Sequence, residues 1–184
     1  MREYFKKTKM KNLLLLLCPC LLVLACKNVD QYRAPIDSLS TEWTKAGEVI
    51  MATGSSLETA TTFLNAMVDS FKIDSTKKFS KPAMMKMDSM KTAFMAQIQG
   101  ISGLSTEVND FKAKWATMTA DVNALTTGLK DGKLEGDVMA KVNDLKSNCA
   151  TALTQAEGWN KNIKGAEKTA VNAYDAFNSA MKMK

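Results

Sequence analysis

The fold is decided by residues 138–180, which read VMAKVNDLKSNCATALTQAEGWNKNIKGAEKTAVNAYDAFNSA. Small or apolar residues recur in this stretch at alternating intervals of four and three. The unbroken series is Val138, Val142, Leu145, Cys149, Ala152, Ala156, Trp159, Ile163, Ala166, Ala170, Ala173, Phe177 and Ala180. This spacing places one apolar seam along a helix and requires other helices packed against it at a shallow angle. We therefore expect a long helix over about residues 137–183.

Two further stretches carry the same kind of seam, and they predict helices over about residues 37–72 and 82–129. The first seam has one polar member, Thr53, and consists of Leu39, Trp43, Ala46, Ile50, Thr53, Leu57, Ala60, Leu64, Met67 and Phe71. The second repeats every seven residues as Met87, Phe94, Ile101, Val108, Trp115, Val122 and Leu129, with companions three residues on at Met90, Gln97, Leu104, Phe111, Met118 and Leu125. We expect Trp43, Trp115 and Trp159 to form an aromatic core layer, one from each helix.

The breaks between the seams predict how the helices are connected. Pro82 is acceptable in a first helical turn, and Asp137 is a good N-cap for the third helix. Connections of this length join antiparallel neighbours. The sequence thus predicts an all-α fold, an elongated antiparallel up-down-up three-helix bundle with coiled-coil-like packing, which resembles a spectrin-type repeat in architecture alone. The alternative is a coiled coil between chains, built from the same seams.

Turns near residues 77 and 133 set the expected register. Residue i of the first helix lies level with about residue 155 − i of the second and 111 + i of the third. This register brings Gly54, Gly100, Gly103 and Gly165 to one level and pairs Gly47 with Gly158. Such a glycine belt is a flexible waist, a place where helices approach closely, or a set of residues that a long bundle tolerates, since each interior glycine costs about 1 kcal/mol against alanine.

The first 26 residues indicate the destination of the chain. A basic stretch precedes an apolar run, Leu13 to Leu24, which is too short for a spanning helix of roughly 20 residues. The run closes on Val23-Leu24-Ala25-Cys26, which resembles the lipobox of bacterial lipoproteins. The resemblance implies a signal peptide over residues 1–25, whether translation starts at Met1 or Met10. It also implies acylation of Cys26 and a lipidated tether over 26–36, ahead of a bundle over 37–184.

Further expectations follow from that resemblance. We expect the protein to bind the membrane through the lipid attached to Cys26. No cofactor is expected apart from this covalent lipid. Lys27 stands where an Asp signals inner-membrane retention in related lipoprotein systems, so the resemblance favours the outer membrane, with the chain facing the periplasm or the surface. Cys18 and Cys20 leave with the signal peptide, so Cys149 is the single free thiol, and its seam position predicts a small buried side chain.

Composition argues against several functions. Residues 1–25 hold five of the 25 Lys and Arg and one of the 19 acids, so the rest carries 20 basic and 18 acidic side chains, which gives no support for nucleic-acid binding. The chain has no His, no phosphate-binding loop and no nucleophile motif. Asp110, Asp121, Asp144 and Glu157 fall outside the seams and are expected to be solvated. We expect neither an enzyme nor a metal centre.

The turn between the first two helices is the candidate binding region. Its residues are Lys77, Lys78, Lys81, Met84, Met85 and Lys86, and the predicted register adds the C-terminus to this membrane-distal tip. Flexible Met among Lys suits an adaptable surface for a protein or an anionic envelope component. We therefore expect a non-catalytic interaction or spacer module, or alternatively a surface-exposed ligand-binding lipoprotein or a carrier of a hydrophobic ligand that opens at the glycine belt.

Two looser resemblances concern the same tip. Residues 84–90, MMKMDSM, look like the methionine-rich stretches of periplasmic copper proteins, which implies Cu(I) binding by soft thioethers. Lys184 ends the chain, and this layout resembles the murein lipoprotein, whose terminal Lys is joined to peptidoglycan.

Overall fold

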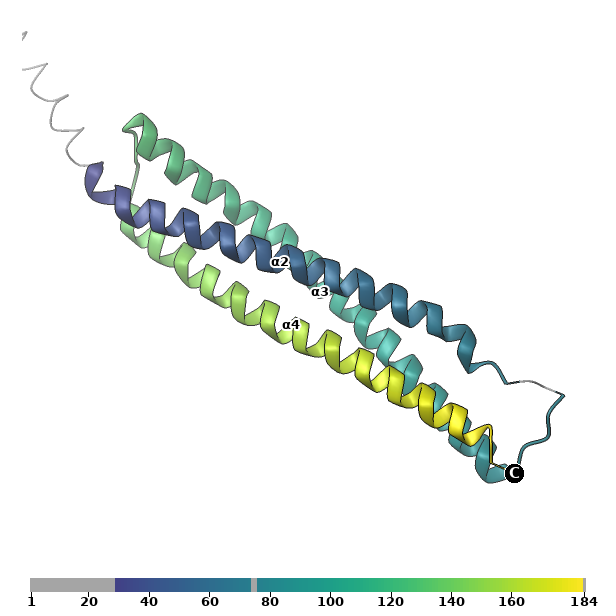
Figure 1. Cartoon of the computed structure of the whole chain (residues 1–184). Coiled ribbons are helices and arrows are strands. Elements are labelled where there is room, and N and C mark those ends of the chain that lie inside the picture. Colours follow the sequence, from purple (N-terminus) through teal and green to yellow (C-terminus); the bar gives the residue numbers. More distant parts are fainter. Residues whose placement is uncertain (1–28, 74–75, 184) are drawn as a thin grey trace, which may run out of the picture. The chain divides into compact units, whose positions relative to one another are not determined.

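The computed structural model describes residues 29–73 and 76–183, and Figure 1 shows the helices that they form. In chain order these are η1 (Asp30–Tyr32), α2 (Arg33–Met67), η2 (Val68–Phe71), α3 (Lys81–Asp131) and α4 (Val138–Ala180). No strand occurs among the described residues. The long helices pack against one another through their seams, so the predicted all-α three-helix bundle is confirmed. The predicted signal peptide, Cys26 and Lys184 lie outside the described residues.

The predicted seams form the core almost residue for residue. Every member of the first seam is buried except Met67, which is half-buried, and every member of the third is buried except the half-buried Ala166. All seven members of the heptad series in α3 are buried. Their companions are less regular, with Leu104 and Leu125 buried and the other four half-buried. Seam spacing therefore predicted which face of each helix is turned inward.

Each long helix contributes to two compact units. Among the described residues, unit 1 contains 29–44 together with Thr117–Cys149, and unit 2 contains 45–73, 76–116 and 150–183. Each unit thus takes one part of α2, one of α3 and one of α4.

The helix bounds differ from the predicted ones most at the start of α2. This helix begins at Arg33 rather than near residue 37, and Ile36 is fully buried. Residues 33–36 are therefore part of the bundle and not of the tether predicted over 26–36. Pro35 does not prevent the early start, because the first four N–H groups of a helix have no partner within it and proline lacks only that group. The later bounds lie within a few residues of the predictions.

The end of α3 and the start of α4 have the capping geometry that their residue types suggest. Gly132 has a positive φ of 68°, its N–H donates to the Leu129 carbonyl at 3.4 Å, and the Lys133 N–H donates to the Gly128 carbonyl at 2.7 Å. These two bonds form a Schellman motif. At the next helix the Ala140 N–H donates to Asp137 Oδ1 at 3.0 Å, which confirms Asp137 as the N-cap of α4.

In unit 1 the register differs from the predicted one. The Trp43 indole N–H donates to Thr119 Oγ1 at 2.9 Å, whereas the predicted register placed Trp43 level with residue 112. The Cys149 thiol donates to the Glu42 carbonyl at 3.4 Å, an offset of 107 residues rather than 111. The shift is about two turns between α2 and α3 and one turn between α2 and α4.

Unit 2 shows shifts in the same direction. In its core, Phe71 stacks on Phe94 with ring centroids 4.3 Å apart and contacts Phe177 with centroids 4.9 Å apart. The predicted register placed Phe71 level with residue 84. Thr53, the polar member of its seam, is fully buried, and its hydroxyl donates to the Val49 carbonyl and accepts from Asn160 Nδ2, both at 2.9 Å. These bonds explain how the seam tolerates a hydroxyl.

The connection between α2 and α3 accounts for the shifted register. Phe71 contacts Phe94, so the 13 residues of α3 from Lys81 to Ala93 precede the level of Phe71. Thirteen helical residues span about 20 Å. The described residues of the intervening segment, 72–73 and 76–80, are non-helical, as expected of a connection that must cover this length between Phe71 and Lys81. The sequence analysis treated this segment as a simple turn, and the register was wrong for that reason.

The three tryptophans are buried, as their seam positions predicted. In unit 2, Phe111 lies 6.2 Å from Trp115 and 5.3 Å from Trp159, centroid to centroid, and mediates between them. Trp43 belongs to unit 1 and has Thr119 as its hydrogen-bond acceptor.

Glycine placement corrects the predicted belt. A Cβ atom at Gly100, Gly103, Gly158 or Gly165 would meet no atom within 4 Å, so no neighbouring helix approaches closely at these positions. A Cβ atom at Gly47 would lie 3.5 Å from Trp115 Nε1, so Gly47 is not paired with Gly158. Gly128 is different, because a Cβ there would lie 2.8 Å from the Lys133 carbonyl oxygen and 3.0 Å from Leu134 Cδ2.

We predict opposite effects of alanine at two of these glycines. Gly128→Ala should lower the free energy of unfolding by about 1–2 kcal/mol, because the new methyl group displaces the Schellman turn. Gly165→Ala, the matched control in an open helical position, should raise it by up to about 1 kcal/mol. Urea denaturation of the mature chain measures both. Destabilisation by Gly165→Ala equal to that by Gly128→Ala would contradict the open space assigned to Gly165.

Candidate functional site

Three segments of unit 2 meet at the candidate binding region. They are the end of α2 with η2, the first turns of α3, and the last turn of α4. Phe71, Ala83 and Ala180, one from each segment, belong to one buried cluster, and Met181 packs against it. Figure 1 shows the C-terminal end of α4 beside the first turns of α3, which is the arrangement that the sequence predicted for this end of unit 2.

The first turns of α3 are exposed because of the shifted register. Residues 81–93 precede the level of Phe71, so this part of α3 packs against α4 without α2 as a third partner. The connecting segment supplies a partial substitute through Phe79, which is half-buried against the core cluster. A single aromatic side chain covers less of the surface of α3 than a neighbouring helix would cover. Met84 is 49% exposed and Met85 74% exposed, and Met85 lies about 200° around the helix from the buried Met87.

We call the resulting surface the Lys/Met end. Its members are all exposed and comprise Val68, Lys72, Ile73, Lys77, Lys78, Lys81, Met84, Met85, Lys86, Lys182 and Met183. They include all six residues predicted from the sequence, Lys77, Lys78, Lys81, Met84, Met85 and Lys86. Val68 and Ile73 were missed because neither is a seam residue. Val68 was assigned to the end of the first helix and Ile73 to the following loop, without regard to exposure.

The charge of the Lys/Met end is positive. Between residues 72 and 90 the chain has five Lys and two Asp. Lys72 pairs with Asp69 at 2.7 Å on an exposed surface, a contact worth at most about 1 kcal/mol. Lys78, Lys81, Lys86 and Lys182 make no ion pair with any residue in 29–73 or 76–183. Their ammonium groups are available to an anionic partner.

The methionine run divides into two groups. Met87 is fully buried in the core cluster and Met90 packs against it, whereas Met84 and Met85 are exposed. The four thioethers are therefore not presented together to a metal ion. Gap-filling by Met in a core explains the buried pair without a ligand role.

Two grooves lie elsewhere. One in unit 1, about 470 Å³, has apolar lining from Met118, Leu125, Leu134 and Leu145 and charged rims that include Asp121 and Asp144. The other, in unit 2, about 580 Å³, is lined in part by Gly100, Gly103 and Gly165. The glycines thus contribute a surface groove between α3 and α4. The sequence analysis grouped these three correctly but did not predict the first groove, which depends on how Leu134 folds back.

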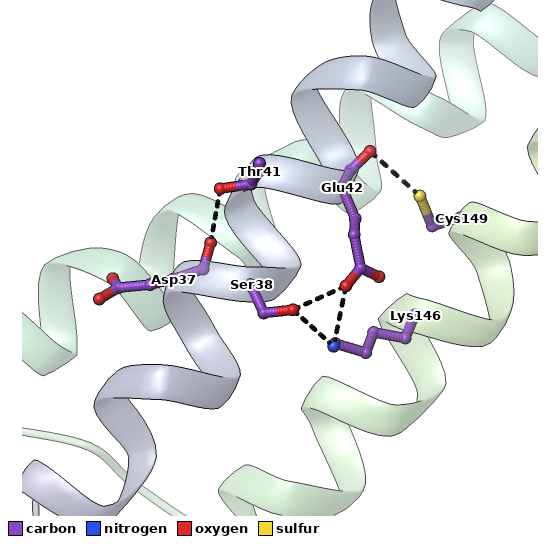
Figure 2. Close-up of polar contacts among 6 residues, drawn as sticks. All are labelled: Asp37, Ser38, Thr41, Glu42, Lys146 and Cys149. Atoms are coloured by element: carbon purple, nitrogen blue, oxygen red, sulfur yellow. Dashed lines mark hydrogen bonds and ion pairs between the residues drawn. The ribbon is translucent and has the colours of Figure 1, made fainter.

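A polar cluster joins α2 to α4 in unit 1, and Figure 2 shows its geometry. Glu42 Oε1 accepts from Ser38 Oγ at 2.7 Å and from Lys146 Nζ at 3.0 Å. Lys146 Nζ also lies 3.0 Å from Ser38 Oγ. These residues were not singled out from the sequence, although Glu42 and Lys146 flank the seam residues Trp43 and Leu145, where inter-helix ion pairs are expected in coiled coils.

Cys149 lies against this cluster as a buried thiol. Its side chain is 3% exposed and donates to the Glu42 backbone carbonyl at 3.4 Å. Burial raises the pKa of the Cys149 thiol, the Glu42 carboxylate raises it further, and the Lys146 ammonium opposes both. A protonated, buried thiol is a poor nucleophile. The predicted role of Cys149 as a small core residue is confirmed.

Chemistry-bearing groups are sparse in the described part of the chain. Asp110, Asp121, Asp144 and Glu157 are all exposed, as predicted. Among residues 29–73 and 76–183, no three His, Cys, Asp or Glu side chains lie close enough to hold a metal ion. No helix in these ranges combines the length and apolar character needed to cross a bilayer. Family models, curated proteins and solved structures were all compared with the chain, and none matches it.

We predict that Cys149 reacts slowly with iodoacetamide at neutral pH in the folded chain, about tenfold or more slowly than in urea. Because the folded pKa exceeds the unfolded one, the stabilisation from the neutral thiol is complete below the unfolded pKa and declines as the pH rises through it. Mass spectrometry of alkylated protein measures the rate. Equal rates with and without urea would contradict burial of the thiol.

Proposed function

We propose that this chain is a lipid-anchored protein of the bacterial cell envelope that acts without catalysis and binds a partner through its Lys/Met end. The observation that carries the binding part is the concentration of exposed apolar side chains among exposed lysines at that surface. Exposed apolar clusters rimmed by polar groups mark interaction sites in soluble domains.

The anchoring part rests on the lipobox-like Val23-Leu24-Ala25-Cys26. Acylation of Cys26 with two or more chains gives stable membrane attachment, since each buried methylene adds about 0.8 kcal/mol. Lys27 favours the outer membrane by the same resemblance, with the bundle facing the periplasm or the surface. Cys26 precedes unit 1 in the sequence, and the Lys/Met end belongs to unit 2. Lipid and binding surface therefore belong to different parts of the chain.

The non-catalytic part rests on the side-chain inventory. The chain lacks His, and its single thiol beyond Cys26 is buried and protonated. The four exposed carboxylates that the sequence singled out are spread over α3 and α4, and of these four Asp121 and Asp144 lie at the rim of the groove in unit 1. These are the features of an interaction or spacer module.

We predict that Cys26→Ser moves the protein from the membrane fraction to the soluble fraction of cells, because the acyl chains are lost. Cys149→Ser is the matched control and should leave the protein in the membrane fraction. Radioactive palmitate should label the Cys149→Ser protein and should not label the Cys26→Ser protein. Membrane retention of the Cys26→Ser protein would contradict the lipid anchor.

The face of the membrane is tested by protease treatment of intact cells, followed by blotting for the region around Trp115. Loss of the signal, with a periplasmic control protein intact, would assign the bundle to the surface. Protection until the outer membrane is permeabilised would assign it to the periplasm. Digestion that requires disruption of the inner membrane would contradict the proposed envelope location.

A further inference from the structure

We infer that the partner of the Lys/Met end is an anionic phospholipid surface, an inference that rests on the proposed binding role of this end. Its side chains combine the two properties that interfacial binding needs. These are cations for the headgroups and flexible apolar groups for the boundary between headgroups and acyl chains.

The charge distribution favours an anionic surface over a neutral one. Residues 29–44 and 117–149 carry 5 basic and 8 acidic side chains, whereas residues 45–116 and 150–184 carry 14 basic and 10 acidic ones. The excess in the second set lies largely at the Lys/Met end. Lys78, Lys81 and Lys86 make no ion pair with the described part of the chain, so their approach to phosphate groups requires no internal contact to break.

The apolar members have the character needed to enter a lipid interface. Met84 and Met85 lie in the first turns of α3, and Ile73 lies in the connection that precedes this helix. None is held in the core cluster, and a thioether side chain adapts its shape readily. Lys81 and Lys86 flank the two methionines in sequence, and their long aliphatic stems allow the ammonium groups to remain at headgroup level.

The residue types at the Lys/Met end favour lipid over protein. Protein interfaces are enriched in aromatic residues, Arg and Met and depleted in Lys, so the features that favour lipid are the lysines and the lack of Arg at this end, not the methionines. The only arginines of the chain are Arg2 and Arg33, far from this end in sequence. The nearby rings of Phe71 and Phe177 are buried, and Phe79 packs against the core. Aromatic anchors are thus directed inward, while lysines and methionines remain outside.

Vesicle sedimentation tests the inference with the mature chain from Cys26, made as Cys26→Ser so that no acyl chain contributes. This chain contains every described residue. It should bind vesicles of phosphatidylcholine mixed equally with phosphatidylglycerol and should not bind phosphatidylcholine alone. High salt should release it, because the lysine contacts are screened.

Two sets of variants identify the surface. Lys78→Gln, Lys81→Gln and Lys86→Gln together should lower partitioning by roughly a hundredfold, at about fivefold per lysine. The control is Lys161→Gln, Lys164→Gln and Lys168→Gln on α4, with the same change in charge, and it should lower partitioning by less than about fivefold. Met84→Ser with Met85→Ser should cost about tenfold, whereas the exposed pair Met51→Ser with Met139→Ser should cost nothing measurable.

Absence of binding to the anionic vesicles, or equal losses for the two lysine sets, would overturn the inference. A photo-reactive residue in place of Met85 in the acylated protein of living cells separates this failure from that of the proposed function. A protein adduct at this position without vesicle binding would keep the binding role and replace lipid by a protein partner. No adduct and no vesicle binding would overturn both proposals.

Discussion

The structure depends on the need to bury one apolar seam on each of three long helices. None of these helices is a stable structure alone in water, because most helical stability in proteins comes from packing of an apolar face. Antiparallel packing of the three seams satisfies all of them at once. The near-complete burial from Leu39 to Phe71 in α2 and η2, and from Val138 to Ala180 in α4, shows that this requirement is met within one chain. Other features of the fold adjust to it.

The Phe71 cluster determines the most consequential adjustment. Stacking of Phe71 on Phe94 fixes the level at which α2 ends against α3 and leaves the first turns of α3 without α2 beside them. Phe79, from the connection between α2 and α3, packs against the core. Met84 and Met85 then stand outside the core although they lie within one turn of the buried Met87.

Much of the fold could be predicted from the sequence because the seams are regular and the helix ends carry clear capping residues. Asp137 and Pro82 marked helix starts correctly, and Thr53 was the right exception in its seam. Register could not be predicted, because seam spacing defines a face but leaves translation along the helix axis undetermined. That translation depends on side-chain shape at Phe71 and on the conformation of residues 72–80. The pairing of Gly47 with Gly158 failed with it, whereas the six predicted residues of the Lys/Met end were found because local composition identifies them independently of register.

The central claim is that the seams are satisfied within one chain, which leaves the Lys/Met end as the surface for a partner. Analytical ultracentrifugation of the mature Cys26→Ser chain, combined with thermal unfolding over a hundredfold range of concentration, tests this claim most directly. The account predicts a monomer whose melting temperature does not change with concentration. An oligomer whose helicity falls on dilution would contradict it, because the seams would then be closed between chains.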